Sequence, residues 1–249
     1  MIKIIFTDLD GTLLDKNYRC DKALELIKKL EVPIVFVSAK TIFEQEVFRK
    51  MLGISDPFVV EDGSAIYAPL NYFGRRIGYR RHGYDALILG VEREVILQHI
   101  KSLNVKSYAN MSVEEISKLT GLSLEMSELA KRREFSEVIV EADEKALKYL
   151  KKFFNVQIGG RFIHVYGKGA DKGKAVRILT ELYEDLYGEV VTIGIGNSYT
   201  DIPMLREVDI PALVRNEDGW IEVDFEVYRA NGVATEGWVE VVKKFVGGD

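Results

Sequence analysis

Hydrophobic and polar positions in the first part of the chain form two kinds of segment. The runs at 2–8 and 33–37 are mostly apolar and rich in β-branched and aromatic residues, as in strands buried on both faces of a parallel sheet. The segments at 21–30 and 42–52 have the spacing of amphipathic helices. Because strands and helices alternate, this order predicts an α/β fold with a parallel sheet.

The pattern changes after a predicted hairpin at 58–67. Residues 71–85 contain three glycines and a cluster of arginines and break the alternation, so we expect a domain boundary there. The following stretch predicts helices at 92–103, from Ser112, at 123–132 and at 143–153, a strand at 136–141 and a hairpin around Gly159 and Gly160. We therefore expect an inserted α/β domain at 81–168.

The first kind of pattern returns near Gly169. We expect a helix at 172–186, strands at 190–195, 210–214 and 225–229, a short helix after Thr200 and a last helix from Glu236. Residues 1–80 and 169–249 would then build one discontinuous, Rossmann-like core around a parallel sheet.

Composition and charge limit the possible partners. With 249 residues, 47% hydrophobic and 29% charged, the chain has the composition of an ordinary globular protein. Its net charge of -5 argues against nucleic acid as a partner, and no apolar run has the length of a membrane span or the form of a signal peptide. Cys20 is the single cysteine, which excludes an intramolecular disulfide. We expect a cytoplasmic protein without nucleic-acid or membrane partners, and find no signal for its oligomeric state.

Two carboxylates follow the first predicted strand. If the chain stays extended, Asp8 and Asp10 point to the same side, and Gly11 allows a turn at the carboxyl edge of the sheet, where open α/β sheets bind ligands. Adjacent carboxylates repel unless a cation lies between them, and carboxylate oxygens suit Mg²⁺. The alternative is that the two acids cap a turn or helix. An EF-hand loop is excluded because Leu13 and Arg19 stand where that loop needs Gly and Glu.

Three further segments carry candidate chemistry at or near the ends of predicted elements. Asn197 and Asp201 follow the strand at 190–195 and offer oxygen atoms that could complete a metal site. Lys172 opens a helix after a glycine-rich loop, which favours anion binding, although the sequence does not match a Walker loop. Ser38 and Lys40 follow the second strand. Each segment alone has an ordinary explanation as a helix cap or solvated surface.

Taken in order, these four segments resemble the four motifs of the haloacid dehalogenase superfamily of phosphatases. The resemblance implies the α/β core with an inserted cap, and the segment Glu61 to Tyr67 is similar to the branch with a large α/β cap, which includes sugar phosphatases and phosphomannomutases. Segments at 38–41, 132–137, 160–164 and 171–176 are most similar to the mannosyl-3-phosphoglycerate phosphatases.

The resemblance also implies roles for individual residues. Asp8 would be the nucleophile and a metal ligand, and Asp10 the acid and base, with its backbone facing the metal. Ser38 and Lys172 would hold phosphoryl oxygens, while Asp201 would be the third carboxylate near Mg²⁺. Asn197 stands where the family usually has Asp. The candidate substrate-binding residues are Lys40, Asp62, Gly63, Arg132, Arg133 and Ser136.

The implied activity is Mg²⁺-dependent hydrolysis of a phosphorylated small molecule through an aspartyl phosphate, with mannosyl-3-phosphoglycerate as the leading substrate. The alternatives are another sugar-phosphate phosphatase and a phosphomannomutase, which would return the phosphoryl group to a sugar. A non-catalytic phosphate-binding protein is least favoured, because it would need neither Asp8 nor Asp10.

Overall fold

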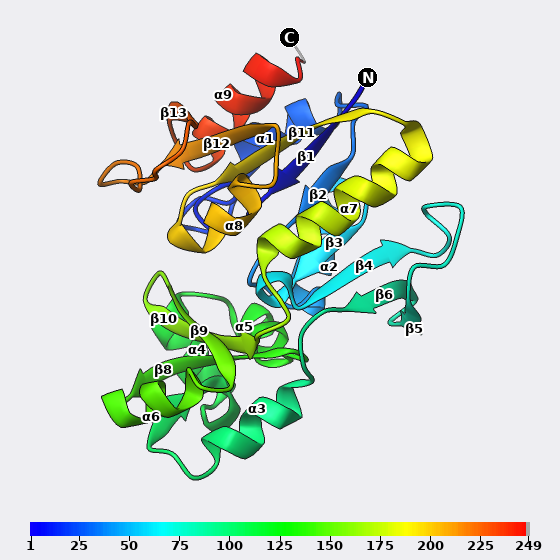
Figure 1. The fold of residues 1–249 in the computed structure, drawn as a ribbon. Coiled ribbons are helices and arrows are strands. Elements are labelled where there is room, and N and C mark those ends of the chain that lie inside the picture. Colours follow the sequence, from blue (N-terminus) through cyan, green and yellow to red (C-terminus); the bar gives the residue numbers. More distant parts are fainter. Residues whose placement is uncertain (248–249) are drawn as a thin grey trace.

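A five-stranded parallel sheet forms the centre of the larger unit in the computed structural model, which describes residues 1–247 (Figure 1). Its strands are β1 (Ile2–Thr7), β2 (Ile34–Phe36), β11 (Val190–Gly196), β12 (Ile210–Arg215) and β13 (Tyr228–Val233), in the order β13-β12-β11-β1-β2. Strand β1 pairs with β11, so the two ends of the sequence meet at the centre of one sheet. This pairing is consistent with a discontinuous core, whose bounds stay a prediction.

Helices cover both faces of this sheet because successive residues of β1 face opposite ways. Ile5 packs among α1 (Asp21–Ile27), α2 (Ile42–Leu52) and α9 (Thr235–Phe245), whereas Ile4 and Phe6 pack against α7 (Lys172–Tyr187) and α8 (Ile202–Leu205). Each face therefore has its own fully buried apolar cluster, which explains the unbroken apolar pattern of the strand.

A second, antiparallel sheet extends the larger unit beyond β2. It consists of β3 (Phe58–Val60), β4 (Ala65–Pro69), β5 (Tyr79–Arg81) and β6 (Tyr84–Ile88), in the order β3-β4-β6-β5, with the short 3₁₀ turn Glu61–Gly63 between β3 and β4. The segment 71–85, where we expected a boundary, thus contains β5 and the start of β6. Its polar residues gave no strand signal because Tyr79 and Arg80 are exposed at the sheet edge. Since β6 pairs with β4, we propose that the inserted domain begins after Ile88.

The inserted domain is a four-stranded antiparallel sheet with helices on both faces (Figure 1, green). The strands are β7 (Val105–Ser107), β8 (Ser136–Ala142), β9 (Phe154–Gly159) and β10 (Phe162–Gly167), and the helices are α3 (Arg93–Ile100), α4 (Val113–Thr120), α5 (Leu124–Lys131) and α6 (Glu144–Leu150). One apolar cluster joins α3 and α6 to the sheet, and another lies beside α4 and α5. Helix α5 also contacts α2, so this side of the inserted domain faces the core.

One strand lies at other residues than expected, and one short strand was not expected. β13 lies at Tyr228–Val233 instead of 225–229, because Phe225 and Val227 pack against the core from a loop without pairing. The strand β7 was not expected, since three residues are too short for a clear pattern. Within residues 1–247, no helix is both long and apolar enough to cross a lipid bilayer.

Candidate active site

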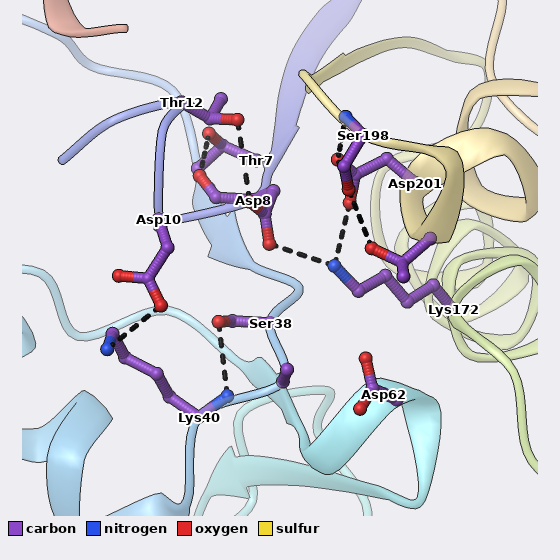
Figure 2. Close-up of polar contacts among 12 residues, drawn as sticks. Thr7, Asp8, Asp10, Thr12, Ser38, Lys40, Asp62, Lys172, Ser198 and Asp201 are labelled. Atoms are coloured by element: carbon purple, nitrogen blue, oxygen red, sulfur yellow. Dashed lines mark hydrogen bonds and ion pairs between the residues drawn. The ribbon is translucent and has the colours of Figure 1, made fainter. Parts of the chain in front are cut away.

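The predicted motifs meet at the carboxyl end of the parallel sheet. Asp8 follows β1, Ser38 follows β2, and Lys172 begins α7 beside them (Figure 2). Asn197 follows β11. Their proximity follows from the topology, because parallel strands end at the same edge of a sheet. The inserted domain lies beyond this edge and contributes residues of its own, described below.

Asp8 lies in a buried charge cluster with Lys172 and Asp201. The Nζ atom of Lys172 donates to Asp8 Oδ1 at 2.8 Å and to Asp201 Oδ1 at 2.7 Å, and all three side chains are at least nine-tenths buried. Burial, followed by the charge of Asp201, raises the pKa of Asp8 to about 7, although Lys172 opposes the shift. Burial alone would lower the pKa of Lys172, but Asp201 and Asp8 together raise it well above its usual value. Lys172 is therefore a fixed ammonium group beside the carboxylate.

Both carboxylate oxygens of Asp201 have partners. Its Oδ1 accepts from Lys172, and its Oδ2 accepts from the backbone N–H groups of Asn197 and Ser198, both at 3.0 Å, and from the Ser198 hydroxyl at 3.1 Å. These contacts show that Asp201 anchors Lys172 and fixes the loop after β11. Its expected role as a metal carboxylate stays a prediction.

The side-chain oxygen of Asn197 lies on the Asp8 side of this loop. The hydroxyl of Thr12 is 3.1 Å from Asn197 Oδ1 and 3.4 Å from Asp8 Oδ2, so the two oxygens share one neighbour. Asn197 Nδ2 donates to Asn216 Oδ1 at 2.9 Å, and Asn216 Nδ2 donates back to the Asn197 carbonyl. This pair of hydrogen bonds holds the amide with its oxygen toward Asp8.

Asp8 and Asp10, which we expected on one side of the chain, have different ion-pair partners. Strand β1 ends at Thr7, so the two-residue alternation of a strand no longer applies at Asp8 and Asp10. The Asp10 carboxylate is half exposed and pairs with Lys40 Nζ at 3.0 Å, whereas Asp8 pairs with Lys172 (Figure 2). The two aspartates therefore have different surroundings, as acid–base and nucleophilic roles require.

Ser38 lies between these two ion pairs. It is buried, and its hydroxyl oxygen accepts a hydrogen bond from the backbone N–H of Lys40 at 3.2 Å. Its carbonyl accepts from the backbone N–H of Asp62, which connects the loop after β2 to the 3₁₀ turn after β3. The hydroxyl proton of Ser38 thus remains available to an oxygen of a ligand.

Asp62 connects the core to the inserted domain. It has a left-handed backbone with φ of 60°, and its Oδ2 atom lies 2.7 Å from Nδ1 of His164 on β10. Burial would raise the pKa of Asp62, but His164 first, and then Lys172 and Arg133, bring it below its usual value. His164 belongs to a segment that carried the resemblance, yet the sequence indicated no partner for it.

Gly63 permits close contact between this turn and the start of α7. Its φ is 91°, and a Cβ atom there would lie 2.2 Å from the carbonyl carbon and oxygen of Asp171, the residue before Lys172. We expect Gly63→Ala to destabilise the fold by about 2 kcal/mol or more and to lower turnover by displacing Lys172. Gly53→Ala is the matched control, since Gly53 also has positive φ but no atom within 4 Å. Equal turnover in both variants, measured with thermal unfolding, would contradict this role.

Glu61 ties the inserted domain to the core and was not singled out from the sequence. Its buried carboxylate accepts from the backbone N–H groups of Glu134 and Phe135, at 2.9 and 3.0 Å, and from the Ser136 hydroxyl at 2.5 Å. Arg133 reaches the core in the opposite direction and donates to the Ala39 carbonyl at 2.6 Å. Ser136 therefore lies in the contact between the two domains, rather than on a free surface.

Arg132 and Arg133 differ in position despite being adjacent. The Arg133 side chain is buried and lines a cavity of about 100 Å³ between the domains, whereas Arg132 is exposed and stacks over the Phe43 ring at 3.7 Å. The cavity lies beside Asp10 and Lys40 on its core side. The other residues that line it are Tyr18, Ala39, Glu44, Tyr108, Thr120, Leu122, Ala130, Val138, Phe162 and His164.

Oxygen atoms around Asp8 suit a hard divalent cation such as Mg²⁺. Among residues 1–247, no group of three or more His, Cys, Asp or Glu side chains is arranged to hold a metal ion. Mg²⁺ commonly takes one or two carboxylates and fills its other positions with water and phosphate. The Asp8 carboxylate and the oriented amide oxygen of Asn197, which share Thr12 as a neighbour, fit that requirement.

The site thus defines a class of α/β proteins with a buried carboxylate and lysine at the edge of a parallel sheet and an inserted domain above it. Comparison with known protein families identifies this class. The family of haloacid dehalogenase-like hydrolases matches residues 5–77 and 84–219. The chain belongs to this family.

Two relatives of known name align with nearly the whole chain. A protein of Persephonella marina named glucosyl-3-phosphoglycerate/mannosyl-3-phosphoglycerate phosphatase is 41% identical, with 96% of this chain and 95% of that protein covered. A mannosyl-3-phosphoglycerate phosphatase of Pyrococcus furiosus is 42% identical over 86% of this chain and 91% of its own. Both names include mannosyl-3-phosphoglycerate phosphatase, the family that the sequence segments resemble.

Solved structures support the fold. A protein from Thermotoga maritima superposes with a TM-score of 0.70 at 20% identity, covering 100% of this chain and 99% of that one. The sucrose-phosphatase of Synechocystis, solved with sucrose and phosphate, superposes with a TM-score of 0.61 at 15% identity, and 98% of each chain is covered. At these identities the likeness confirms the fold.

Proposed function

We propose that this protein is a Mg²⁺-dependent phosphatase that hydrolyses glycosyl-3-phosphoglycerates, with the mannosyl compound as the leading substrate. The observation that carries the proposal is the buried pair of Asp8 and Lys172, at 2.8 Å, beside the oriented amide of Asn197. The names of the aligned relatives support the choice of substrate.

The reaction needs two displacements at phosphorus. An Asp8 oxygen forms a bond to phosphorus while the bond from phosphorus to the glycerate oxygen breaks, and Asp10 gives that oxygen a proton. Water then attacks the aspartyl phosphate, Asp10 takes a proton from the water, and inorganic phosphate leaves with Asp8 restored. Asp10 can serve both steps because its first step leaves it as the base that the second step requires.

The remaining groups would stabilise the negative charge of the phosphoryl group. Lys172 and the Ser38 hydroxyl would hold phosphoryl oxygens, which become more negatively charged in the transition state. Mg²⁺ held by Asp8, Asn197 and the Asp10 carbonyl would supply positive charge between the nucleophile and the phosphate, which otherwise repel each other. Asp201 would act indirectly, by holding Lys172 in place at 2.7 Å.

Phosphate release tests the proposal directly. We expect free phosphate from mannosyl- or glucosyl-3-phosphoglycerate in Mg²⁺ and none in EDTA, with a panel of other sugar phosphates as comparison. A phosphomannomutase would move the phosphoryl group between sugar positions without releasing phosphate. Binding without either reaction would indicate a non-catalytic protein, and both outcomes would contradict the proposal.

The raised pKa of Asp8 gives the effect of Mg²⁺ a pH dependence. Without metal, a carboxyl whose pKa rises from 3.8 to about 7 favours the fold only when protonated, so its contribution to stability is lost as pH rises between these values. Mg²⁺ binds the deprotonated form. We therefore expect the rise in unfolding temperature caused by Mg²⁺ to grow between pH of about 5.5 and about 8.5. Asp8→Asn should remove this trend, and a pH-independent Mg²⁺ effect in the wild type would contradict it.

A further inference from the structure

We infer that Arg133 is a specificity residue that binds a carboxylate on the leaving group, and that it does so from the cavity beside Asp10. The inference rests on the proposed function and names the part of the substrate that the enzyme recognises. Its basis is the position of the buried Arg133 guanidinium group in the wall of the cavity.

The Arg133 side chain extends from the inserted domain to the core, and two of its guanidinium nitrogen atoms donate hydrogen bonds to the protein. Nη2 donates to the Ala39 carbonyl at 2.6 Å, and Nε donates to the Ser136 hydroxyl at 2.9 Å. Within residues 1–247, Nη1 has no protein hydrogen-bond partner and is not among the buried atoms that lack one. Because Arg133 lines the cavity, this donor is available to a ligand there.

Burial would lower the pKa of Arg133, but the surrounding carboxylates, led by Glu61 and Glu44, raise it above its usual value, so the guanidinium stays charged. The nearest carboxylate oxygen, on Glu61, lies 3.8 Å from Nε, and Glu61 is itself occupied by two backbone N–H groups and the Ser136 hydroxyl. Among residues 1–247, no carboxylate accepts a hydrogen bond from this guanidinium. A ligand carboxylate would be the first anion bonded to it directly, and the flat guanidinium is suited to bind it.

The position of the cavity matches the chemistry of the leaving group. Asp10 must meet the ester oxygen, and Asp10, Lys40 and Arg133 all line the same small space. In 3-phosphoglycerate the carboxylate is separated from the ester oxygen by two carbon atoms, so an ester oxygen at Asp10 leaves the carboxylate near the cavity walls. Lys40 also lines this space but is already paired with Asp10 at 3.0 Å and with Glu44 at 3.5 Å, so we assign the ligand carboxylate to Arg133.

The size of the cavity explains why the glycerate part, rather than the sugar, is assigned to it. Its volume of about 100 Å³ is well below the roughly 300–1,000 Å³ of typical small-molecule pockets. It therefore accepts only one end of a glycosyl phosphoglycerate while the domains are in this arrangement. The cap must move to admit the whole substrate.

The test compares two substrates that differ only in the charge of this group. We would measure kcat/KM in Mg²⁺ for a glycosyl-3-phosphoglycerate and for its carboxyl methyl ester. We expect the wild type to prefer the acid on the order of 100-fold, as for a charged hydrogen bond in a built site. In Arg133→Met the ratio should fall to within about 5-fold of one, with Arg133→Lys between them.

Arg177→Met is the matched control, because Arg177 is an exposed arginine that pairs with Glu207 outside the cavity lining and should keep the wild-type ratio. A wild type that hydrolyses acid and ester equally well overturns the inference even if the Arg133 variants fail to fold. An unchanged ratio in a folded Arg133→Met protein also overturns it. If neither compound is hydrolysed by the wild type in Mg²⁺, the proposed function itself has failed, which is a distinguishable outcome.

Discussion

Asp8→Asn is expected to abolish phosphate release while the protein remains folded. The amide keeps the shape of the side chain but cannot attack phosphorus, so turnover should fall on the order of 10⁴-fold or more. The fold should tolerate the change, because Lys172 still has Asp201 at 2.7 Å and an uncharged group at position 8 avoids the cost of burying a carboxylate. Phosphate release and thermal unfolding measure the two effects separately.

A second Asp→Asn substitution controls for the chemistry of the change. Asp143 begins α6 on the inserted domain, where its carboxylate accepts from the Ala146 N–H, and Asn caps helices about as well as Asp. Asp143→Asn should retain turnover. If Asp8→Asn also retained turnover, another residue would have to be the nucleophile.

Lys172→Met is expected to cost both stability and activity. Without the ammonium group, two buried carboxylates that now share it, Asp8 and Asp201, would remain without a counter-ion. Removing one partner of a buried ion pair typically costs about 3–5 kcal/mol of unfolding free energy. Turnover should fall about 10³-fold, because the phosphoryl oxygens lose their fixed cation.

The stability loss in Lys172→Met should depend on pH in a definite direction. With the lysine removed, the pKa of Asp8 should rise further, so the fold favours its protonated form and the penalty increases as pH rises. Denaturant unfolding should therefore show a larger gap from the wild type near pH 8 than near pH 5. Lys174→Met is the control, since that ammonium donates to the Gly169 carbonyl near the surface. A gap that shrinks toward pH 8 would contradict the assignment.

The parts of the fold that the sequence predicted are those with strong local patterns. The central strands β1 and β11 are buried on both faces, so their apolar runs were clear, and the amphipathic α7 begins at its expected residue. The hairpin of β5 and β6 was missed because its exposed residues, such as Tyr79, need no apolar alternation. Its place beside β4 depends on long-range pairing, which local patterns do not encode.

The same distinction applies to the site. Asp8, Ser38, Lys172 and Asn197 were predictable because each is close to the end of a recognisable element, and parallel topology brings those ends together. The different ion-pair partners of Asp8 and Asp10 were not predictable, because Lys172 and Lys40 come from distant elements.

Contacts between the two domains could not be predicted from the sequence either. Glu61 binds the backbone of residues 134 and 135, and His164 meets Asp62 more than a hundred positions away. Beside Asp62, the sequence shows a Gly in a predicted turn. The left-handed backbone of Asp62 is seen only in the structure.

Trapping the phosphorylated enzyme tests the central claim most directly. The protein would be mixed with glycosyl-3-phosphoglycerate labelled at phosphorus in Mg²⁺, quenched in acid during the first turnover, and cleaved at low pH for peptide mapping. We expect an acyl phosphate, released by hydroxylamine, on Asp8 of the peptide that ends β1. Label on a different side chain, or phosphate release at full rate with no labelled protein at any time, would contradict the assignment of Asp8 as the nucleophile.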